Sequence, residues 1–328
     1  MQQLPAPAFI FNLSTGYFAP RCLHLVAQLG VADVLGNTPM SSEELARATG
    51  AHADSLHRML RLLSAHGVFE RRGGGWAHND YSEHLKSNHP QSLRSLVMMF
   101  GDDINWRSAG ALGVSARTGQ TACDSVTPGG LWPYLQAHPE DARVFDAAMT
   151  GKSHMAIAAV LQAMEFHRYE HIADIAGGRG HILSAVLDAT PRSQGTLFDQ
   201  PHVVENSLPH PRMKKQAGDF FVGPLPRADA YIVSNILHDW ADPQAISILR
   251  QIRQVAPAHA ELLVLEMMLP EGPELHPALV MDLVMLSLAG GRERTQVQYD
   301  ALFAEGGFKL DRIIPTHSPY SIIVGKVA

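Results

Sequence analysis

The sequence predicts an α/β protein, in which a mainly parallel β-sheet is covered on both faces by helices and follows a mostly helical N-terminal region. Two observations predict this fold class. After about Glu165, short β-rich runs alternate with helical runs, which is typical of parallel βαβ units. Before Glu165, apolar residues recur with helical periodicity. We therefore expect the functional residues at the carboxyl ends of the strands.

Charge argues against two classes of partner. The 328 residues include 26 Lys and Arg against 32 Asp and Glu, a net charge of −6. A mildly acidic surface does not attract nucleic acid or anionic lipid. No apolar run approaches the roughly 20 residues that a membrane span needs. We expect neither nucleic acid nor membrane as a partner.

Cysteine and histidine usage bear on compartment and metal content. Cys22 and Cys123 are the only cysteines and fit no redox or metal spacing. No basic residue precedes Arg21, so no secretory signal is expected, and a cytoplasmic location is the simplest prediction. The 18 histidines are scattered without zinc-binding spacing, so we expect no metal.

The first helices are predicted from apolar faces and caps. Residues 23–30 place Leu23, Val26 and Ala27 on one helical face, and the apolar run at 9–13 must be buried against another surface. Residues 38–50 predict a capped helix. Ser41 and Glu44 form a capping box, and Gly50 closes the end of that helix.

The next segment predicts a helix followed by a hairpin. Leu56, Met59, Leu60 and Leu63 form an apolar stripe that Gly67 ends, and a glycine-tipped hairpin follows. Two helices and a hairpin form the pattern of a winged helix, which raises a DNA-binding interpretation. Residues 1–100 carry eight basic and seven acidic residues, a net charge of +1, without the basic face typical of DNA readers. A module for dimer contact or for covering a pocket is favoured.

Six β-rich runs are predicted in the C-terminal half. Prolines 273 and 277 mark a loop after the fifth run. The runs are residues 171–176, 195–199, 214–221, 229–235, 261–266 and 320–328.

A glycine cluster follows the first run. A dinucleotide fingerprint needs a third glycine where Leu183 stands, and a phosphate-binding P-loop needs Gly-Lys-Ser/Thr, which is absent. Gly177, Gly178 and Gly180 therefore form a turn without a phosphate signature. The turn is compatible with a ligand that carries no phosphate.

Acidic residues at successive strand ends suggest what that ligand is. Asp174 lies within the first run, and Asp199 follows 25 residues later, near the offset at which such folds bind a ribose. Asp219 and Phe220 at the next strand end suit the amino group and the flat face of adenine. A nucleoside that carries a cation and no phosphate is S-adenosylmethionine, whose sulfonium is tolerated near an aromatic face such as Trp240.

A candidate base follows the fourth run. His238 suits the removal of a phenolic proton if a carboxylate fixes its tautomer, and Glu266 and Glu293 are the candidate carboxylates. Two alternatives stay open: His238 as a helix N-terminal residue without chemistry, and Glu293 as a surface charge paired with Arg292 or Arg294.

Large apolar residues are candidates for an aromatic acceptor pocket. They are also compatible with simple core packing, which is the more common role of methionine. These candidates are Trp106, Phe145, Met149, Met155, Met281 and Met285.

The motifs DIAGGRG, FDQP, GDFF, LHDW, LLVLE and GGRERTQVQYDALFAEGGF, taken in order, resemble those of S-adenosylmethionine-dependent O-methyltransferases of the caffeate, hydroxyneurosporene and acetylserotonin type. Bacterial members act on aromatic natural products, phenazines among them. The resemblance implies a class I methyltransferase (Rossmann-like) sheet and a homodimer formed through a winged-helix dimerisation domain. It implies a dimerisation domain at 1–100, a pocket-lining helical region at 101–165 and a cofactor-binding catalytic domain at 166–328.

The resemblance also transfers roles to residues. The glycine turn at 177–178 would approach the cofactor, with Asp199 at its ribose, Asp219 and Phe220 at its adenine, and Ser234 at its methionine end. His238 would be the general base, flanked by Glu266 and Glu293. The sequence departs from the family pattern at Ala176, where glycine is usual, and at Gln200 and Ser234, where plant members carry an apolar residue and lysine.

The leading hypothesis is thus O-methylation of a phenol, a phenazine or a similar aromatic metabolite, without a metal. One alternative is a methyltransferase fold that performs cofactor-assisted hydroxylation or decarboxylation. The other is a winged-helix regulator without enzymatic activity.

Overall fold

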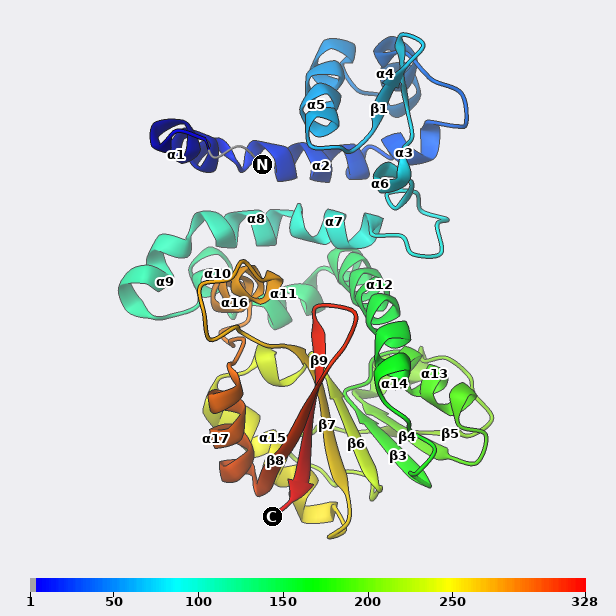
Figure 1. Cartoon of the computed structure of the whole chain (residues 1–328), viewed down its shortest axis with the longest axis vertical. Coiled ribbons are helices and arrows are strands. Elements are labelled where there is room, and N and C mark those ends of the chain that lie inside the picture. The colour runs from blue at the N-terminus through cyan, green and yellow to red at the C-terminus, as the bar shows by residue number, and fades with distance from the viewer. Residues whose placement is uncertain (1–3) are drawn as a thin grey trace. The chain divides into compact units, whose positions relative to one another are not determined.

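The computed structural model describes residues 4–328, apart from the side chains of residues 154 and 155. The chain divides into two compact units, whose elements are labelled in Figure 1. One unit comprises the chain up to Trp106 together with Leu135–Gly151, and the other comprises Arg107–Tyr134 and Lys152–Ala328. The predicted three-part division at residues 100 and 165 stays a prediction.

The first unit is mostly helical, with one small antiparallel hairpin. Three helices, α8 (Asp103–Gly110), α11 (Leu131–Ala137) and α12 (Pro139–Ala163), have residues in both units. The remaining elements of the first unit are α1 (Ala6–Thr15), α2 (Phe18–Gln28), α3 (Val31–Val34), α4 (Ser42–Thr49), α5 (Ala53–Ala65), β1 (Glu70–Arg72), β2 (Gly75–Ala77), α6 (Asp80–Glu83) and α7 (Arg94–Phe100).

The predicted caps of the N-terminal helices are confirmed. The backbone nitrogen of Glu44 donates to Ser41 Oγ at 3.2 Å, and the Ser41 nitrogen donates to Glu44 Oε2 at 2.7 Å, which completes the capping box of α4. Gly50 ends that helix in the left-handed conformation. Trp76 of the hairpin is fully buried against the apolar faces of α4 and α5, so the hairpin closes the core of this unit.

Helix α1 keeps its apolar side chains exposed. Phe9, Ile10, Phe11 and Leu13 are between 55% and 69% exposed in the described chain. The burial expected for residues 9–13 is therefore not provided within the chain.

The second unit is built on a seven-stranded sheet with helices on both faces. The elements of the second unit are α9 (Leu112–Thr118), α10 (Ala122–Val126), β3 (His171–Ile175), α13 (His181–Ala189), β4 (Gln194–Asp199), α14 (Pro201–Glu205), β5 (Met213–Ala217), β6 (Ala230–Ser234), the short 3₁₀ helix η1 (Leu237–Asp239), α15 (Asp242–Val255), β7 (Glu261–Met267), α16 (Pro277–Leu288), α17 (Gln296–Gly306), β8 (Phe308–Pro315) and β9 (Tyr320–Val327).

In the part of the chain that the structure describes, no helix is long and apolar enough to cross a membrane, and Cys22 and Cys123 are both free.

The strand order is β5-β4-β3-β6-β7-β9-β8, and the pairs from β5 to β7 are parallel. Strand β9 is antiparallel to both β7 and β8. The prediction of a mainly parallel sheet is confirmed, but the sixth predicted run does not continue the parallel series. It cannot, because the short connection from β8 allows only an antiparallel return. Strand β8 was not predicted, since its partly exposed polar residues hide a strand pattern.

The alternation of side chains along the strands creates two apolar layers. In β3, Ala173 and Ile175 join the core that packs against α15 and α17, whereas Ile172 joins the core beneath α13. Figure 1 shows α15 and α17 on one side of the sheet and α13 on the other. With both faces covered, the carboxyl ends of the strands are the edge at which functional side chains gather.

Candidate active site

The glycine turn lies directly after β3. A Cβ atom added to Gly177 would lie 2.4 Å from Cγ of Asp174 and 2.6 Å from Cδ1 of Leu197, so no larger residue fits. The backbone nitrogen of Gly178 donates to Asp199 Oδ2 at 2.8 Å. The structure therefore brings together the glycine turn and both predicted acids, one from β3 and one from β4.

Ala176 stands where the family usually has glycine, and its backbone adopts a conformation that favours glycine. Its φ angle is +54°, in the left-handed region that glycine adopts without cost. Its backbone nitrogen donates to the carbonyl oxygen of Phe198 at 2.7 Å, which fixes the residue in that conformation. A side chain here costs about 1 kcal/mol of backbone strain.

Asp174 is a buried carboxyl group beneath the turn. Its side chain is 1% exposed, and neither oxygen has a hydrogen-bond partner among the described residues. Burial, and then the negative charge of Asp199, raise the pKa of Asp174 to about 7. The group is therefore only partly ionised near neutral pH, and a cation bound beside it would favour the ionised form.

The next strand ends carry the amino acids that are predicted to bind adenosine. Asp199 ends β4, and Asp219 follows β5, where its Oδ1 accepts from the nitrogen of Phe221 at 2.8 Å. The rings of Phe220 and Phe221 lie 4.7 Å apart between centroids, and the indole of Trp240 lies 6.1 Å and 4.9 Å from them. These residues form one aromatic cluster beside the strand ends.

Ser234 ends β6 and is held by its neighbour. The side-chain amide of Asn235 donates to Ser234 Oγ at 3.2 Å, and the Asn235 nitrogen donates to the carbonyl of Leu265 at 3.1 Å. Asn235 also has a left-handed φ of +53°. The chain turns sharply here toward η1, and this turn brings His238 to the sheet edge.

His238 pairs with Glu293. The His238 side chain is 4% exposed, and its Nδ1 lies 2.7 Å from Glu293 Oε1. Because a carboxylate accepts, Nδ1 carries the proton and Nε2 is left free to accept one. Burial lowers the pKa of His238, and burial raises the pKa of Glu293 to about 7.

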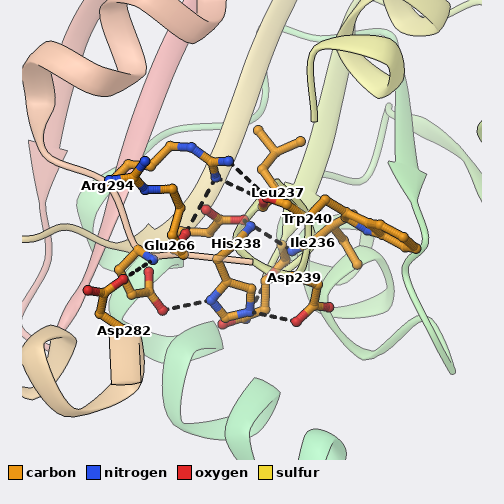
Figure 2. A network of polar contacts seen from close by, with 12 residues as sticks. Ile236, Leu237, His238, Asp239, Trp240, Glu266, Asp282 and Arg294 are labelled. Atoms are coloured by element: carbon orange, nitrogen blue, oxygen red, sulfur yellow. Dashed lines mark hydrogen bonds and ion pairs between the residues drawn. The ribbon is translucent and has the colours of Figure 1, made fainter. Parts of the chain in front are cut away.

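Glu266 acts on the backbone rather than on the imidazole. Its Oε1 accepts from the backbone nitrogens of Ile236 and His238, both at 3.1 Å, and its Oε2 accepts from the hydroxyl of Tyr299. Figure 2 shows Glu266 beside the turn that carries His238. Of the two predicted flanking acids, only Glu293 contacts the ring, and Glu266 holds the turn in place.

Arg294 is a second anchor of this turn. Its guanidinium donates to the carbonyl oxygens of Leu237 and Trp240, both at 2.9 Å, and pairs with Asp242 at 2.8 Å. The alternative that Glu293 is a surface charge is wrong, because Glu293 is fully buried and Arg294 pairs with Asp242 instead.

Gly291 allows the close packing of this segment. A Cβ atom there would lie 1.9 Å from the carbonyl oxygen of His238, and the nitrogen of Arg292 donates to that same oxygen at 2.8 Å. The backbone of His238 is thus held from β7 by Glu266 and from residues 291–294 on the other side.

Two charged residues of the site were not among the candidate site residues predicted from the sequence. The carboxyl of Asp239 lies 3.6 Å from Nε2 of His238, and burial raises its pKa to about 6. Its position beside His238 in sequence was the signal that could have identified it. Lys152 of α12 contributes a buried ammonium group, with no motif around it to reveal its role.

The candidate acceptor residues fall in both units. Trp106, Phe145 and Met149 belong to the first unit, and Met281 and Met285 lie on α16 of the second. The ring of Trp106 packs under the guanidinium of Arg21, at 4.9 Å, within the first unit. The side chain of Met155 lies outside the described residues. The role of all six in acceptor binding stays a prediction.

No cluster of three or more His, Cys, Asp or Glu suited to a metal ion occurs among the described residues. Two charged pairs lie at the sheet edge, His238 with Glu293 and Arg294 with Asp242. Figure 2 shows the contacts around His238 as dashed lines.

Comparison with known proteins gives consistent results. An O-methyltransferase dimerisation domain matches residues 11–88, and an O-methyltransferase domain matches residues 112–309. A phenazine O-methyltransferase from Lysobacter antibioticus is 38% identical, covering 98% of this chain and 96% of that relative.

Solved structures agree in fold. The crystal structure of LaPhzM has a TM-score of 0.93 and 37% identity, and the match covers 99% of this chain and 100% of that chain. An O-methyltransferase from neocarzinostatin biosynthesis, solved with S-adenosylmethionine and 2-hydroxy-5-methyl naphthoic acid, has a TM-score of 0.79 and 30% identity, over 95% of this chain and 96% of that one. The chain therefore belongs to the O-methyltransferase family.

Proposed function

We propose that this chain transfers a methyl group from S-adenosylmethionine to a hydroxyl oxygen of an aromatic small molecule, with His238 as the general base. The observation that carries the proposal is the buried pair of His238 and Glu293, 2.7 Å apart, at the sheet edge that also bears the glycine turn. A free phenol titrates near pH 10, so a base within reach of its oxygen speeds the reaction.

The strand ends fit the cofactor. The carboxylate oxygens of Asp199 suit the donor hydroxyls of a ribose, and Asp219 with Phe220 suits adenine. Asp174 is a buried carboxyl without a partner among the described residues, so it suits a ligand that brings positive charge. We assign cofactor binding to these residues and to Gly177, Gly178, Ser234 and Trp240.

Each residue of the pair has a defined task. Glu293 accepts the Nδ1 proton of His238, and this leaves Nε2 unprotonated. Nε2 takes the proton of the acceptor hydroxyl, and the carboxylate of Glu293 stabilises the resulting imidazolium. When bound, S-adenosylmethionine supplies an electrophilic methyl group on a positively charged sulfur. Positioning of the two reactants contributes most of the acceleration.

The proposed acceptor is a hydroxylated aromatic such as a phenol or a hydroxyphenazine. Support comes from the similarity to a phenazine O-methyltransferase and to a structure that holds a hydroxylated naphthoic acid. The proposed assembly is a homodimer. Residues 11–88 match a dimerisation domain, and α1 exposes a row of large apolar side chains that a second copy would cover.

Two alternative functions are less well supported. Cofactor-assisted hydroxylation or decarboxylation does not need a base for a phenol, whereas His238 and Glu293 form a buried pair suited to that task. A regulator that binds DNA would need a basic face, and the first 100 residues carry a net charge of only +1.

The test is an assay of purified protein with S-adenosylmethionine and a panel of phenols and hydroxyphenazines, with mass spectrometry of the products. We expect products heavier by one methyl group. His238→Ala should lose turnover by about 10²- to 10⁴-fold while it retains cofactor binding in calorimetry. His259→Ala is the matched control, because this exposed histidine pairs with Asp229 on the surface. Absence of any methylated product, or full turnover in His238→Ala, would contradict the proposal.

A further inference from the structure

Lys152 places a buried ammonium group at the same sheet edge. Its side chain comes from α12, the residue is only 8% exposed, and Nζ lies 5.9 Å from the centroid of the Tyr320 ring. Tyr320 pairs across the sheet with Met267, the residue that follows Glu266. The ammonium therefore lies near the strand end from which Glu266 holds the His238 turn.

No carboxylate or carbonyl oxygen of the described residues contacts the Lys152 ammonium directly. Among the side chains that the structure describes, Lys152 Nζ has no hydrogen-bond partner and no ion pair within 4.0 Å. Arg294, the other buried cation of this region, is fully occupied by Asp242 and two carbonyl oxygens. A largely buried ammonium whose one contact in the described part of the chain is the face of the Tyr320 ring keeps its three donors available, so the site favours an anion or a strong acceptor from outside the chain.

The surrounding carboxyl groups favour the charged form of the Lys152 ammonium without contacting it. Burial lowers the pKa of Lys152, and the negative charges of Asp239, Glu293 and Glu266 oppose that lowering. Two of these acids, Asp239 and Glu293, are the same groups that flank the imidazole of His238. The Lys152 ammonium and the proposed base therefore share the same neighbouring carboxyl groups.

A base alone leaves the proposed reaction with an unfavourable proton transfer. Burial holds the pKa of His238 below its ordinary 6.5, whereas a phenol titrates near 10. Transfer from acceptor to imidazole is then uphill by more than about three orders of magnitude at equilibrium. A cation at the acceptor oxygen reduces this gap because it stabilises the oxyanion selectively.

We propose that Lys152 binds the acceptor through the oxygen that is methylated and stabilises it as an oxyanion beside His238. This inference rests on the proposed function. The acceptor proton moves to Nε2 of His238 and the oxygen forms a bond to the methyl carbon. The carbon–sulfur bond breaks with its electron pair left on sulfur. Lys152 keeps its own protons throughout, and the positive charge of the sulfonium is replaced by that of the imidazolium.

The favoured substrate class follows. An acceptor whose hydroxyl is acidic, or stabilised as an anion by its ring, binds best to this arrangement. A neutral aliphatic alcohol gains little from it, because its oxygen does not ionise at an accessible pH.

The first test measures ionisation of a bound acceptor without turnover. 1-Hydroxyphenazine changes its visible spectrum when it ionises, and it is titrated in complex with the protein and S-adenosylhomocysteine. In the wild type, the midpoint should lie about two pH units or more below that of the free compound. In Lys152→Met the midpoint should return toward the free value, and in Lys152→Arg it should remain low. Lys326→Met is the control, because this half-exposed lysine pairs with Asp311 away from the site.

The second test measures turnover across acceptors of different acidity. Lys152→Met should lower kcat by about 100-fold for phenols that titrate near 10, because the bound phenol must still ionise. For nitrophenols that are already ionised at the assay pH, kcat should fall by less than about five-fold and the loss should appear as a raised KM. Thermal unfolding and cofactor calorimetry verify that the variant is folded.

The outcomes separate the two proposals. An equal loss of kcat for all phenols, with an unchanged ionisation midpoint in Lys152→Met, overturns the role of Lys152 and leaves the proposed methyl transfer intact. A wild-type ionisation midpoint equal to that of free 1-hydroxyphenazine also overturns the role of Lys152, whether or not product forms. Absence of methylated product from the wild type, with a lowered midpoint, contradicts the proposed function instead.

Discussion

Nδ1 of His238 lies 2.7 Å from Oε1 of Glu293, and the two side chains are 4% and 0% exposed. A buried contact of this length fixes one tautomer of the imidazole, because only Nδ1–H can donate to the carboxylate. Glu266, the other predicted acid, contacts the backbone of the same histidine and not its ring. The two carboxylates therefore differ in what their removal should do.

Glu293→Gln should reduce kcat by about 100-fold or more while cofactor affinity is retained, because a neutral amide does not stabilise the imidazolium that forms during proton transfer. Steady-state kinetics and calorimetry provide the measurement. Glu305→Gln, at an exposed position in α17, is the matched control and should leave kcat unchanged. A Glu293→Gln enzyme with normal kcat would show that this carboxylate does not assist the base.

Glu266→Ala should act mainly on stability. It removes the acceptor for the nitrogens of Ile236 and His238 and for the hydroxyl of Tyr299, and all three donors are left without that partner. We expect the free energy of unfolding to fall by about 3 kcal/mol or more in urea titrations. Glu266→Gln keeps one acceptor oxygen and should lose less. Equal stability of Glu266→Ala and the wild type would mean that water replaces the carboxylate.

Asp174→Asn should change the pH dependence of stability. The pKa of Asp174 is raised from 3.8 to about 7 by burial and by Asp199. Between these values the folded state holds more protons than the unfolded state, so the stability contribution present at low pH is lost as pH rises toward 7. Relative to wild type, the variant should be more stable at about pH 8 than at about pH 4.5, by on the order of 2–4 kcal/mol.

Urea unfolding of the cofactor-free protein at both pH values measures this difference. Asp188→Asn is the control, since its side chain is 76% exposed. The prediction fails when the stability change of Asp174→Asn is the same at both pH values.

Ala176→Gly should stabilise the protein by about 1 kcal/mol, because it removes the strain of a side chain at a φ of +54°. Ala185→Gly, within helix α13, should have the opposite sign and cost about 1 kcal/mol. Thermal unfolding of both variants measures the contrast. A destabilised Ala176→Gly would show that the methyl group packs usefully in the turn.

The sheet edge could be predicted from the sequence because parallel strands bring their carboxyl ends together. Asp199 and Asp219 lie at or near the ends of β-rich runs and His238 follows one, and this position alone was enough to group them. The caps of α4 and the hairpin were predicted from local signals that involve neighbours in the chain.

Contacts between distant residues could not be predicted in the same way. Which of Glu266 and Glu293 contacts the ring depends on side-chain direction, and Glu293 lies 55 positions from His238. Lys152 lies in a helix whose apolar pattern is weak, so no local signal separates it from a surface lysine. Strand β8 was missed because it has one mostly solvated face.

The turn that carries His238 is tied to Glu266 on β7 and to Arg294 before α17, and these anchors belong to the sheet edge and its adjoining segment. Asp282 of α16 also accepts from the backbone nitrogen of Glu293, at 2.9 Å. Residues of α16 other than Asp282 can therefore change without loss of these anchors. A duplicated gene of this type can diverge at such positions, while the anchors of the methyltransferase site are inherited unaltered.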